Sequence, residues 1–163
     1  MFGFEESYGY LTGSYVRDKD GVDGAYMICE MFSYYATKGI SLLDKLDELY
    51  KTYGYCLNTL HSYEFDGSAG FAKMQSIMQA FRGGIKEFGG KKVVKLLDYA
   101  PGLDGLPKSD VLKFLLEDNC SIVVRPSGTE PKLKTYISVS AENKEAAEIV
   151  EAEIRKSAEE YLK

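Results

Sequence analysis

Histidine and cysteine are scarce in this chain, and their positions argue against two common kinds of site. The 163 residues include one histidine and three cysteines, which lie far apart and form no C-x-x-C pair. Without a cluster of such residues a zinc site has no support, so we predict no metal-binding residue in this chain. An odd number of separated cysteines argues against a disulfide framework and favours a reducing, cytoplasmic compartment. We assign these side chains to packing or to the surface; they are His61, Cys29, Cys56 and Cys120.

Long apolar segments and an excess of basic residues are also missing. No apolar run has the length needed to span a bilayer, and the N-terminus has neither the basic nor the apolar region of a signal peptide. The chain has 20 basic and 25 acidic residues, a net charge of −5, whereas non-specific nucleic-acid binding needs a basic field. We therefore expect a cytoplasmic protein whose partners include neither nucleic acid nor membrane.

Apolar residues are plentiful, at 45% of the chain, so a folded core is expected. Residues 1–20 are rich in glycine, tyrosine and charge and predict a loop with a short extended piece. Helices are predicted over 22–37 and 41–53, with Gly39 ending the first and Ser41 capping the second. Apolar residues cover most of the first helix, which we therefore expect to be largely buried.

Strand patterns dominate after Gly54. The stretch E-D-N-C between two apolar runs predicts a β-hairpin with an Asp-Asn turn. These patterns predict an α+β fold in which an antiparallel sheet is covered by helices, preceded by a partial helical piece. The expected strands are 55–65, 92–99, 111–116, 121–124 and 133–139, and the expected helices are 69–82 and 142–162.

The segment R-P-S-G-T-E-P-K at residues 125–132 has the residue types that bind phosphate. Arg125 presents a fork of N–H donors that matches two phosphate oxygens, and Gly128 lets backbone N–H groups approach an anion. Further donors and positive charge come from Ser127, Thr129, Lys132 and Lys134. A tight turn would use the same residues, with proline and glycine setting its shape. The residues alone leave both interpretations open, although the spacing excludes a Walker A loop.

Two charged segments near the N-terminus are candidates for contacts with a sugar. Glu5, Glu6 and Ser7 combine two carboxylates with a hydroxyl, and a carboxylate can accept hydrogen bonds from two sugar hydroxyls. A solvated acidic turn explains these residues equally, and chemistry alone favours it. The segment R-D-K-D-G at 17–21 suits a surface ion-pair cluster and lacks the later residues of a calcium loop.

Taken together and in this order, these segments resemble the α-D-phosphohexomutase superfamily, which includes phosphoglucomutase and phosphomannomutase. R-P-S-G-T-E-P-K is similar to the family's C-terminal phosphate-binding loop, and F-E-E-S-Y-G at 4–9 is similar to its sugar-binding loop. R-D-K-D-G also matches, and L-P-K-S-D-V-L-K-F at 106–114 is similar to bacterial members. The resemblance covers the whole chain but only the C-terminal portion of the family's four-domain enzymes.

The resemblance implies interconversion of hexose 1-phosphate and hexose 6-phosphate, with glucose, mannose or both as the sugar. In the family a phosphoserine in the first domain donates its phosphoryl group, and a bisphosphate intermediate returns one to the serine. Mg²⁺ held by aspartates of a D-G-D-x-D-R motif in the second domain, and a glucose 1,6-bisphosphate-type activator, are implied as cofactors. The metal and nearby cations would stabilise the transferring group.

The matching motifs also imply roles for individual residues. Glu5 and Ser7 are expected to bind sugar hydroxyls, and Lys19 corresponds to an active-site lysine in some members, a candidate general acid or base. The residues expected to hold the phosphate that does not react are Arg125, Ser127, Gly128, Thr129 and Lys132.

The chain departs from the family pattern, because it has neither D-G-D-x-D-R nor a phosphoserine segment of the type T-x-S-H-N. We therefore expect it to be inactive alone, with a phosphosugar and the missing N-terminal domains of the same chain as its partners. Residues 1–53 would be the C-terminal part of the α/β sugar-binding third domain. Residues 54–163 would be the phosphate-binding fourth domain, with Gly54 as a candidate hinge.

Three alternatives remain open at this point. A phosphopentomutase-like member of the same superfamily would also suit the F-E-E and D-K-D-G segments. A non-catalytic module that binds a phosphosugar would need the same two loops. A purely structural domain would have a loop that binds nothing.

Overall fold

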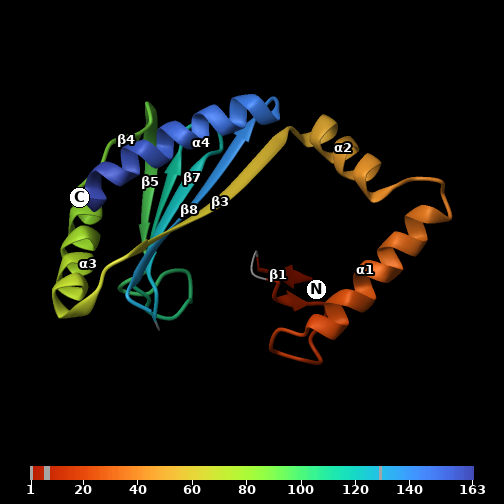
Figure 1. Ribbon diagram of the computed structural model, residues 1–163, viewed down its shortest axis with the longest axis horizontal. Helices are drawn as coiled ribbons and strands as arrows, with labels where there is room; N and C mark the ends of the chain where they lie inside the picture. The colour runs from red at the N-terminus through yellow and green to blue at the C-terminus, as the bar shows by residue number, and fades with distance from the viewer. Residues whose placement is uncertain (1, 6–7, 129) are drawn as a thin grey trace. The chain divides into compact units, whose positions relative to one another are not determined.

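The computed structural model describes residues 2–5, 8–128 and 130–163 of the chain (Figure 1). The chain divides into two compact units, Met1–Thr52 and Tyr53–Lys163, and each is described by itself.

The N-terminal unit contains a two-stranded antiparallel sheet followed by two helices. Gly3 pairs with Leu11 across the sheet, which confirms the short extended piece predicted in this region. The elements are β1 (Gly3–Phe4), β2 (Tyr10–Leu11), α1 (Gly21–Ala36) and α2 (Leu42–Tyr53, ending at the division between the units).

Local capping interactions set the limits of both helices. The Asp20 carboxylate accepts a hydrogen bond from the Val22 N–H at 2.9 Å at the start of α1. Ser41 Oγ accepts one from the Asp44 N–H at 3.0 Å at the start of α2. Gly39 lies between the helices with φ of 68°, a left-handed conformation in which glycine commonly ends a helix. The predicted roles of Gly39 and Ser41 are confirmed.

The prediction that α1 is largely buried is wrong in this structure. Gly24 is its one buried residue, and a side chain there would collide with the ring of Tyr10. The N-terminal unit offers only the small β1–β2 sheet to pack against α1, which is too little to cover an apolar helix. The large apolar side chains left exposed on α1 are Val22, Tyr26, Met27, Ile28, Met31, Phe32 and Tyr34.

The C-terminal unit is an antiparallel sheet of six strands in the order β3-β8-β7-β6-β5-β4 (Figure 1). Every neighbouring pair is antiparallel, so the predicted α+β class with an antiparallel sheet is confirmed. The elements are β3 (Tyr55–Glu64), α3 (Gly67–Arg82), β4 (Glu87–Phe88), β5 (Lys91–Asp98), β6 (Leu112–Leu116), β7 (Ser121–Pro126), β8 (Lys132–Ala141) and α4 (Lys144–Glu159), followed by a 3-10 turn (Glu160–Leu162).

The β6–β7 hairpin forms as the sequence predicts. Asp118 and Asn119 have φ values of 55° and 54°, and the Cys120 N–H donates to the Glu117 carbonyl at 3.2 Å. Positive φ at both central residues is the geometry of a type I′ turn, whose twist matches that of the flanking strands.

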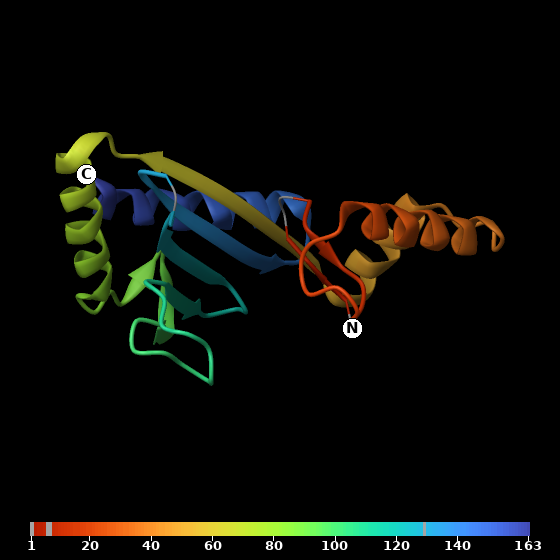
Figure 2. The same cartoon turned by 90° about the horizontal axis from the view of Figure 1, so that it is seen from below.

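Alternation along the strands places the core on one face of this sheet, where α3 and α4 cover it. On β8, for example, every second residue is buried and the residues between are half-buried; the buried ones are Leu133, Thr135, Ile137 and Val139. Figure 2 shows α4 running along β3 and β8, the strands that it contacts. The opposite face carries no helix among the described residues of this unit, so side chains on that face stay accessible.

Arg82, at the end of α3, ties that helix to the sheet and to the loop before β6. Its Nε lies 2.9 Å from Asp98 Oδ2, and its Nη2 lies 2.6 Å from Asp110 Oδ1. The guanidinium lowers the pKa of the Asp98 carboxyl below its usual value by hydrogen bonding to the charged form.

Replacing Arg82 by glutamine is expected to lower the free energy of unfolding by about 1–2 kcal/mol at about pH 7, because both carboxylates lose a charged donor. Because the pKa of Asp98 is depressed in the folded state, this stabilisation is present above the ordinary carboxyl pKa and is lost as pH falls through the depressed value. The free energies of unfolding of the unchanged chain and of Arg82→Gln, measured in urea, should therefore become equal as the pH is lowered. Lys95→Gln on β5, whose amine has no ion pair in the described structure, should show no such pH-dependent difference, and parallel curves for Arg82→Gln at all pH values would contradict the assignment.

Candidate functional site

The two charged N-terminal segments lie together in the N-terminal unit. Pairing of β1 with β2 folds the chain back, and the Asp20 N–H donates to the Tyr10 carbonyl at 2.9 Å. As a result Lys19 Nζ lies 3.2 Å from Glu5 Oε2, with both side chains about half exposed. The structure thus brings two of the predicted site residues, Glu5 and Lys19, into one accessible ion pair.

Gly9 makes this arrangement possible, and sequence reasoning did not single it out. A side-chain carbon at position 9 would lie 2.7 Å from Glu5 Oε2 and would also collide with the Lys19 stem. Gly9 is buried beneath the ion pair, and the Glu5 N–H donates to its carbonyl at 2.8 Å. The only sequence signal was a glycine closing the segment F-E-E-S-Y-G.

Two predicted site residues lie outside the described residues. They are Ser7, expected to contact the sugar, and Thr129, expected to contact the phosphate. Their predicted roles stay predictions.

The segment at 125–132 runs from the end of β7 to the start of β8, as its position between two predicted strands indicates. The Ser127 N–H donates to the Lys132 carbonyl at 2.7 Å, and the Lys132 N–H donates to the Glu130 carbonyl at 2.8 Å. The Phe65 N–H donates to the Pro131 carbonyl at 2.9 Å, which fixes the loop to the chain leaving β3. The loop is therefore anchored at both ends by backbone hydrogen bonds.

Two cationic side chains stand at the start of this loop on the uncovered face of the sheet. Arg125 pairs with Lys134 across β7 and β8, so both side chains point to the same face. Their neighbours Val124, Leu133 and Thr135 point into the core. In the part of the chain that the structure describes, neither Arg125 nor Lys134 has an acidic partner, so their positive charges remain available to an anion.

Lys132 differs from these two cations, because carboxylates already surround its amine. Lys132 Nζ lies 3.1 Å from Glu130 Oε1 and 3.3 Å from Glu64 Oε1. The hydrogen bond to Glu130, followed by that to Glu64, raises the pKa of Lys132 above its usual value. Its charge is thus largely offset within the protein, and the accessible positive charge of the loop comes from Arg125 and Lys134.

Gly128 stands in open space at the tip of the loop. A side-chain carbon built there meets no atom within 4 Å, so the packing of the described chain does not require glycine at this position. The open position leaves the adjoining backbone accessible to a ligand. A hollow of about 480 Å³ lies between this loop and α3, with Ser127, Gly128 and Met74 in its wall.

Metal ligands are not gathered anywhere in the described residues. No group of three or more histidine, cysteine, aspartate or glutamate side chains in that part of the chain could hold a metal ion.

Comparison with known proteins identifies the family of these two units. The model of the phosphoglucomutase/phosphomannomutase C-terminal domain matches residues 65–156, more than half of the chain. The model of the alpha/beta/alpha domain III of the same family matches residues 1–53. The chain belongs to the phosphoglucomutase/phosphomannomutase family. The resemblance of the sequence segments to this superfamily is confirmed.

Curated proteins similar to this chain include phosphoglucomutases of two staphylococci. A phosphoglucomutase of Staphylococcus aureus is 39% identical over 155 residues, covering 88% of this chain and 28% of the relative. A phosphoglucomutase of Staphylococcus epidermidis is 34% identical over 155 residues with the same coverage. The chain thus spans 28% of the length of these relatives.

A solved member of the phosphoglucomutase/phosphomannomutase family supports the same fold. The open form of parafusin, a phosphoglucomutase from Paramecium, aligns with a TM-score of 0.67 over 96% of this chain and 29% of its own. At 21% sequence identity this likeness concerns the fold. In this chain, no helix among the described residues has the length and apolar character needed to cross a membrane.

Proposed function

We propose that this chain forms the sugar- and phosphate-binding parts of a phosphohexomutase that interconverts hexose 1-phosphate and hexose 6-phosphate. The observation that carries the proposal is the pair of Arg125 and Lys134, which present uncompensated positive charge beside the open backbone at Gly128. The family membership and the relatives named phosphoglucomutase support glucose as a sugar, and mannose remains a second candidate.

In this proposal the loop at 125–132 binds the phosphate that does not react. The Arg125 guanidinium donates a bidentate pair of hydrogen bonds to two phosphate oxygens, and Lys134 adds charge from the neighbouring strand. Ser127, Thr129 and the backbone at Gly128 supply further donors, and Lys132 contributes through its link to Glu130 by orienting the loop. Such a grip fixes one end of the substrate and leaves the other end free to react.

Glu5 and Ser7 are proposed to bind sugar hydroxyls, with Lys19 orienting the Glu5 carboxylate. The same position makes Lys19 a candidate general acid or base, since it reaches the surface on which a sugar hydroxyl would lie. In this proposal the N-terminal unit binds sugar hydroxyls and the C-terminal unit binds a phosphate. Such contacts would let one enzyme accept the substrate in either orientation.

The catalytic centre itself is proposed to lie elsewhere in a longer protein. The described residues do not fit a Mg²⁺ site, because they contain no group of three side chains that could hold a metal ion. A phosphoserine, its Mg²⁺ and the remaining domains would come from that protein, and the rest of its third domain would cover the exposed apolar surface of α1. A glucose 1,6-bisphosphate-type activator would bind the loop at 125–132 through either of its phosphates.

An NMR titration of this chain with glucose 1-phosphate and with inorganic phosphate tests the proposal. Both ligands should shift signals of residues 125–134, and only the sugar phosphate should also shift residues 3–11. The chain alone should form no glucose 6-phosphate during the titration. Absence of any shift at the loop up to about 10 mM of either ligand, enough to detect millimolar affinity, would overturn the phosphate-binding role. Formation of glucose 6-phosphate would overturn the proposed inactivity.

A further inference from the structure

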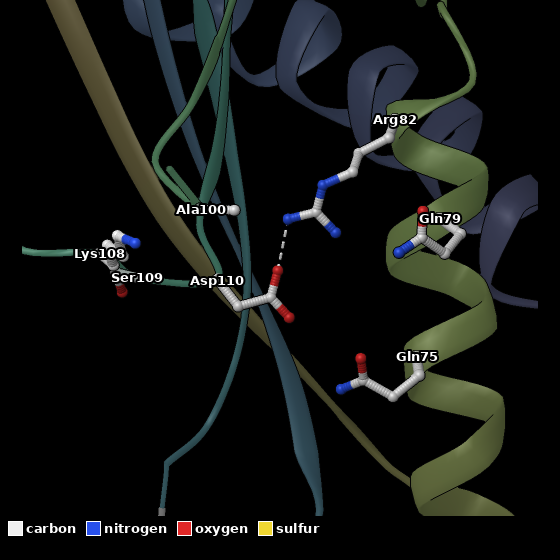
Figure 3. A pocket seen from close by; sticks show the side chains of 7 residues that line it. All are labelled: Gln75, Gln79, Arg82, Ala100, Lys108, Ser109 and Asp110. Carbon is white, nitrogen blue, oxygen red and sulfur yellow. Dashed lines mark hydrogen bonds and ion pairs between the residues drawn. The ribbon is translucent and has the colours of Figure 1, made fainter. Parts of the chain in front are cut away.

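A second hollow in the C-terminal unit, of about 470 Å³, lies between α3 and the loop that joins β5 to β6 (Figure 3). That volume falls within the roughly 300–1,000 Å³ typical of small-molecule sites. Its wall is polar on both sides, and it adjoins the hollow beside the phosphate loop because Gln75 and Asp110 line both. None of the residues that the structure describes between 125 and 132 forms part of its wall.

Two side-chain amides one helical turn apart supply the α3 wall of this hollow. Gln75 and Gln79 extend from α3 toward Asp110 in Figure 3, and neither has a hydrogen bond to another residue of the described chain. Each amide offers two N–H donors and a carbonyl acceptor. The helix therefore presents two amides whose donors and acceptors have no partner within the described structure.

The opposite wall supplies complementary groups from the β5–β6 loop. Asp110 Oδ1 accepts a hydrogen bond from Arg82 Nη2 at 2.6 Å, and the second carboxylate oxygen has no hydrogen-bond partner in the described structure. Lys108 and Ser109 bring an amine and a hydroxyl, which likewise have no partner among the described residues. The hollow thus combines free donors and acceptors on facing elements.

The charges around the hollow cancel. Arg82 and Lys108 carry positive charge, and Asp110 and Asp98, the two partners of Arg82, carry negative charge. A site of this kind has no net attraction for a phosphate, in contrast to the pair of Arg125 and Lys134. It suits a neutral molecule whose hydroxyls both donate and accept hydrogen bonds.

Short hydrogen bonds hold the loop wall in place before any ligand binds. The Ala100 N–H donates to Asp98 Oδ1 at 2.9 Å, and the Ser109 N–H donates to the Tyr99 carbonyl at 3.0 Å. Arg82 then joins this loop to α3. A wall fixed in this way loses little conformational entropy when a ligand binds.

We propose that the hollow between α3 and the β5–β6 loop is a binding site for a neutral, hydroxyl-rich small molecule of the free sugar or polyol class. Gln75, Gln79 and Asp110 bind its hydroxyls, while Lys108 and Ser109 lie beyond Asp110 along the loop wall (Figure 3). This site adjoins the hollow beside the proposed phosphate-binding loop, but none of the described loop residues lines it.

An NMR titration of the full chain with D-glucose tests this inference, using the side-chain amides as probes. The chain has only two glutamines, Gln75 and Gln79, and three asparagines at 58, 119 and 143 that serve as internal controls. Both glutamine amides should shift and reach saturation with a midpoint of about 1–50 mM, while the asparagine amides stay in place. Inorganic phosphate, by contrast, should not shift the amide of Gln79, which lines this hollow but not the one beside the phosphate loop.

Two variants make the test specific. Gln79→Leu keeps α3 intact and should raise the glucose dissociation constant, measured at the Gln75 amide, about 3- to 10-fold. This is the effect of losing one hydrogen-bonding group. Lys73→Gln is the matched control, since Lys73 lies on the opposite side of α3, and it should bind glucose as the unchanged chain does. Glutamine signals that change linearly without saturation or that follow the asparagines, or a Gln79 amide that responds equally to phosphate, would overturn the site.

Discussion

Replacing Arg125 by alanine is expected to weaken the binding of inorganic phosphate to this chain at least about 10-fold. A charged hydrogen bond contributes about 1.5–3 kcal/mol, and the guanidinium can make two to one phosphate. Since Arg125 is exposed at the end of β7, its removal should leave the fold intact. The measurement is the phosphate dissociation constant from NMR shifts of residues 125–134, compared with the unchanged chain.

Three further variants separate this role from a general effect of charge. Arg125→Lys keeps the positive charge without the planar fork and should recover part of the affinity. Lys132→Ala should weaken binding less than Arg125→Ala, because Glu130 and Glu64 already offset the Lys132 charge. Lys113→Ala, on the same face of the sheet but on β6, should change the affinity little. Equal phosphate affinity in the unchanged chain and in Arg125→Ala would exclude the loop as the anion site.

Replacing Phe114 by alanine is expected to lower the free energy of unfolding of the C-terminal unit by about 3–5 kcal/mol. Phe114 is fully buried on β6, and its ring centroid lies 5.1 Å from that of Phe88 and 6.2 Å from that of Phe81. Its removal would leave a cavity between α3 and the sheet, and the lost aromatic contacts add to the lost apolar burial. Urea unfolding followed by the fluorescence of the tyrosines measures the change.

The control for this prediction is Leu60→Ala on β3. Leu60 is 37% exposed on the uncovered face of the sheet, so its truncation should cost no more than about 1 kcal/mol. Phe114→Leu keeps most of the apolar volume and remains measurable if the alanine variant does not fold. Similar losses for Phe114→Ala and Leu60→Ala would show that the core is not centred on this aromatic cluster.

Local sequence patterns predicted the secondary structure of this chain well. Ser41 and Gly39 set helix limits through hydrogen bonds and backbone conformation that involve only their near neighbours. Asp118 and Asn119 form the predicted turn for the same reason. The burial of α1 was predicted wrongly, because burial depends on the other elements available to pack against a helix, and a helical pattern does not contain that information.

The candidate site, like the fold, could be predicted from the sequence only in part. The segments 4–9, 17–21 and 125–132 could be recognised from residue types and order, since a phosphate or a sugar requires particular donors and acceptors. The pairing of Lys132 with Glu64 could not be predicted, because it depends on β3 and β8 lying side by side although they are far apart in the sequence. The polar hollow beside α3 was missed for the same reason.

The sequence by itself determined the family, the helices and strands, and the residue types that a phosphosugar would contact. Each of these depends on short segments whose chemistry is independent of distant residues. Only the tertiary structure decided which charges remain available. Within the described part of the chain Arg125 and Lys134 stay uncompensated on one face of the sheet, whereas Lys132 and Arg82 are paired with carboxylates. Electrostatic interaction falls with distance, and the distances between these side chains are set by strand register and helix packing, which become defined only when the chain folds.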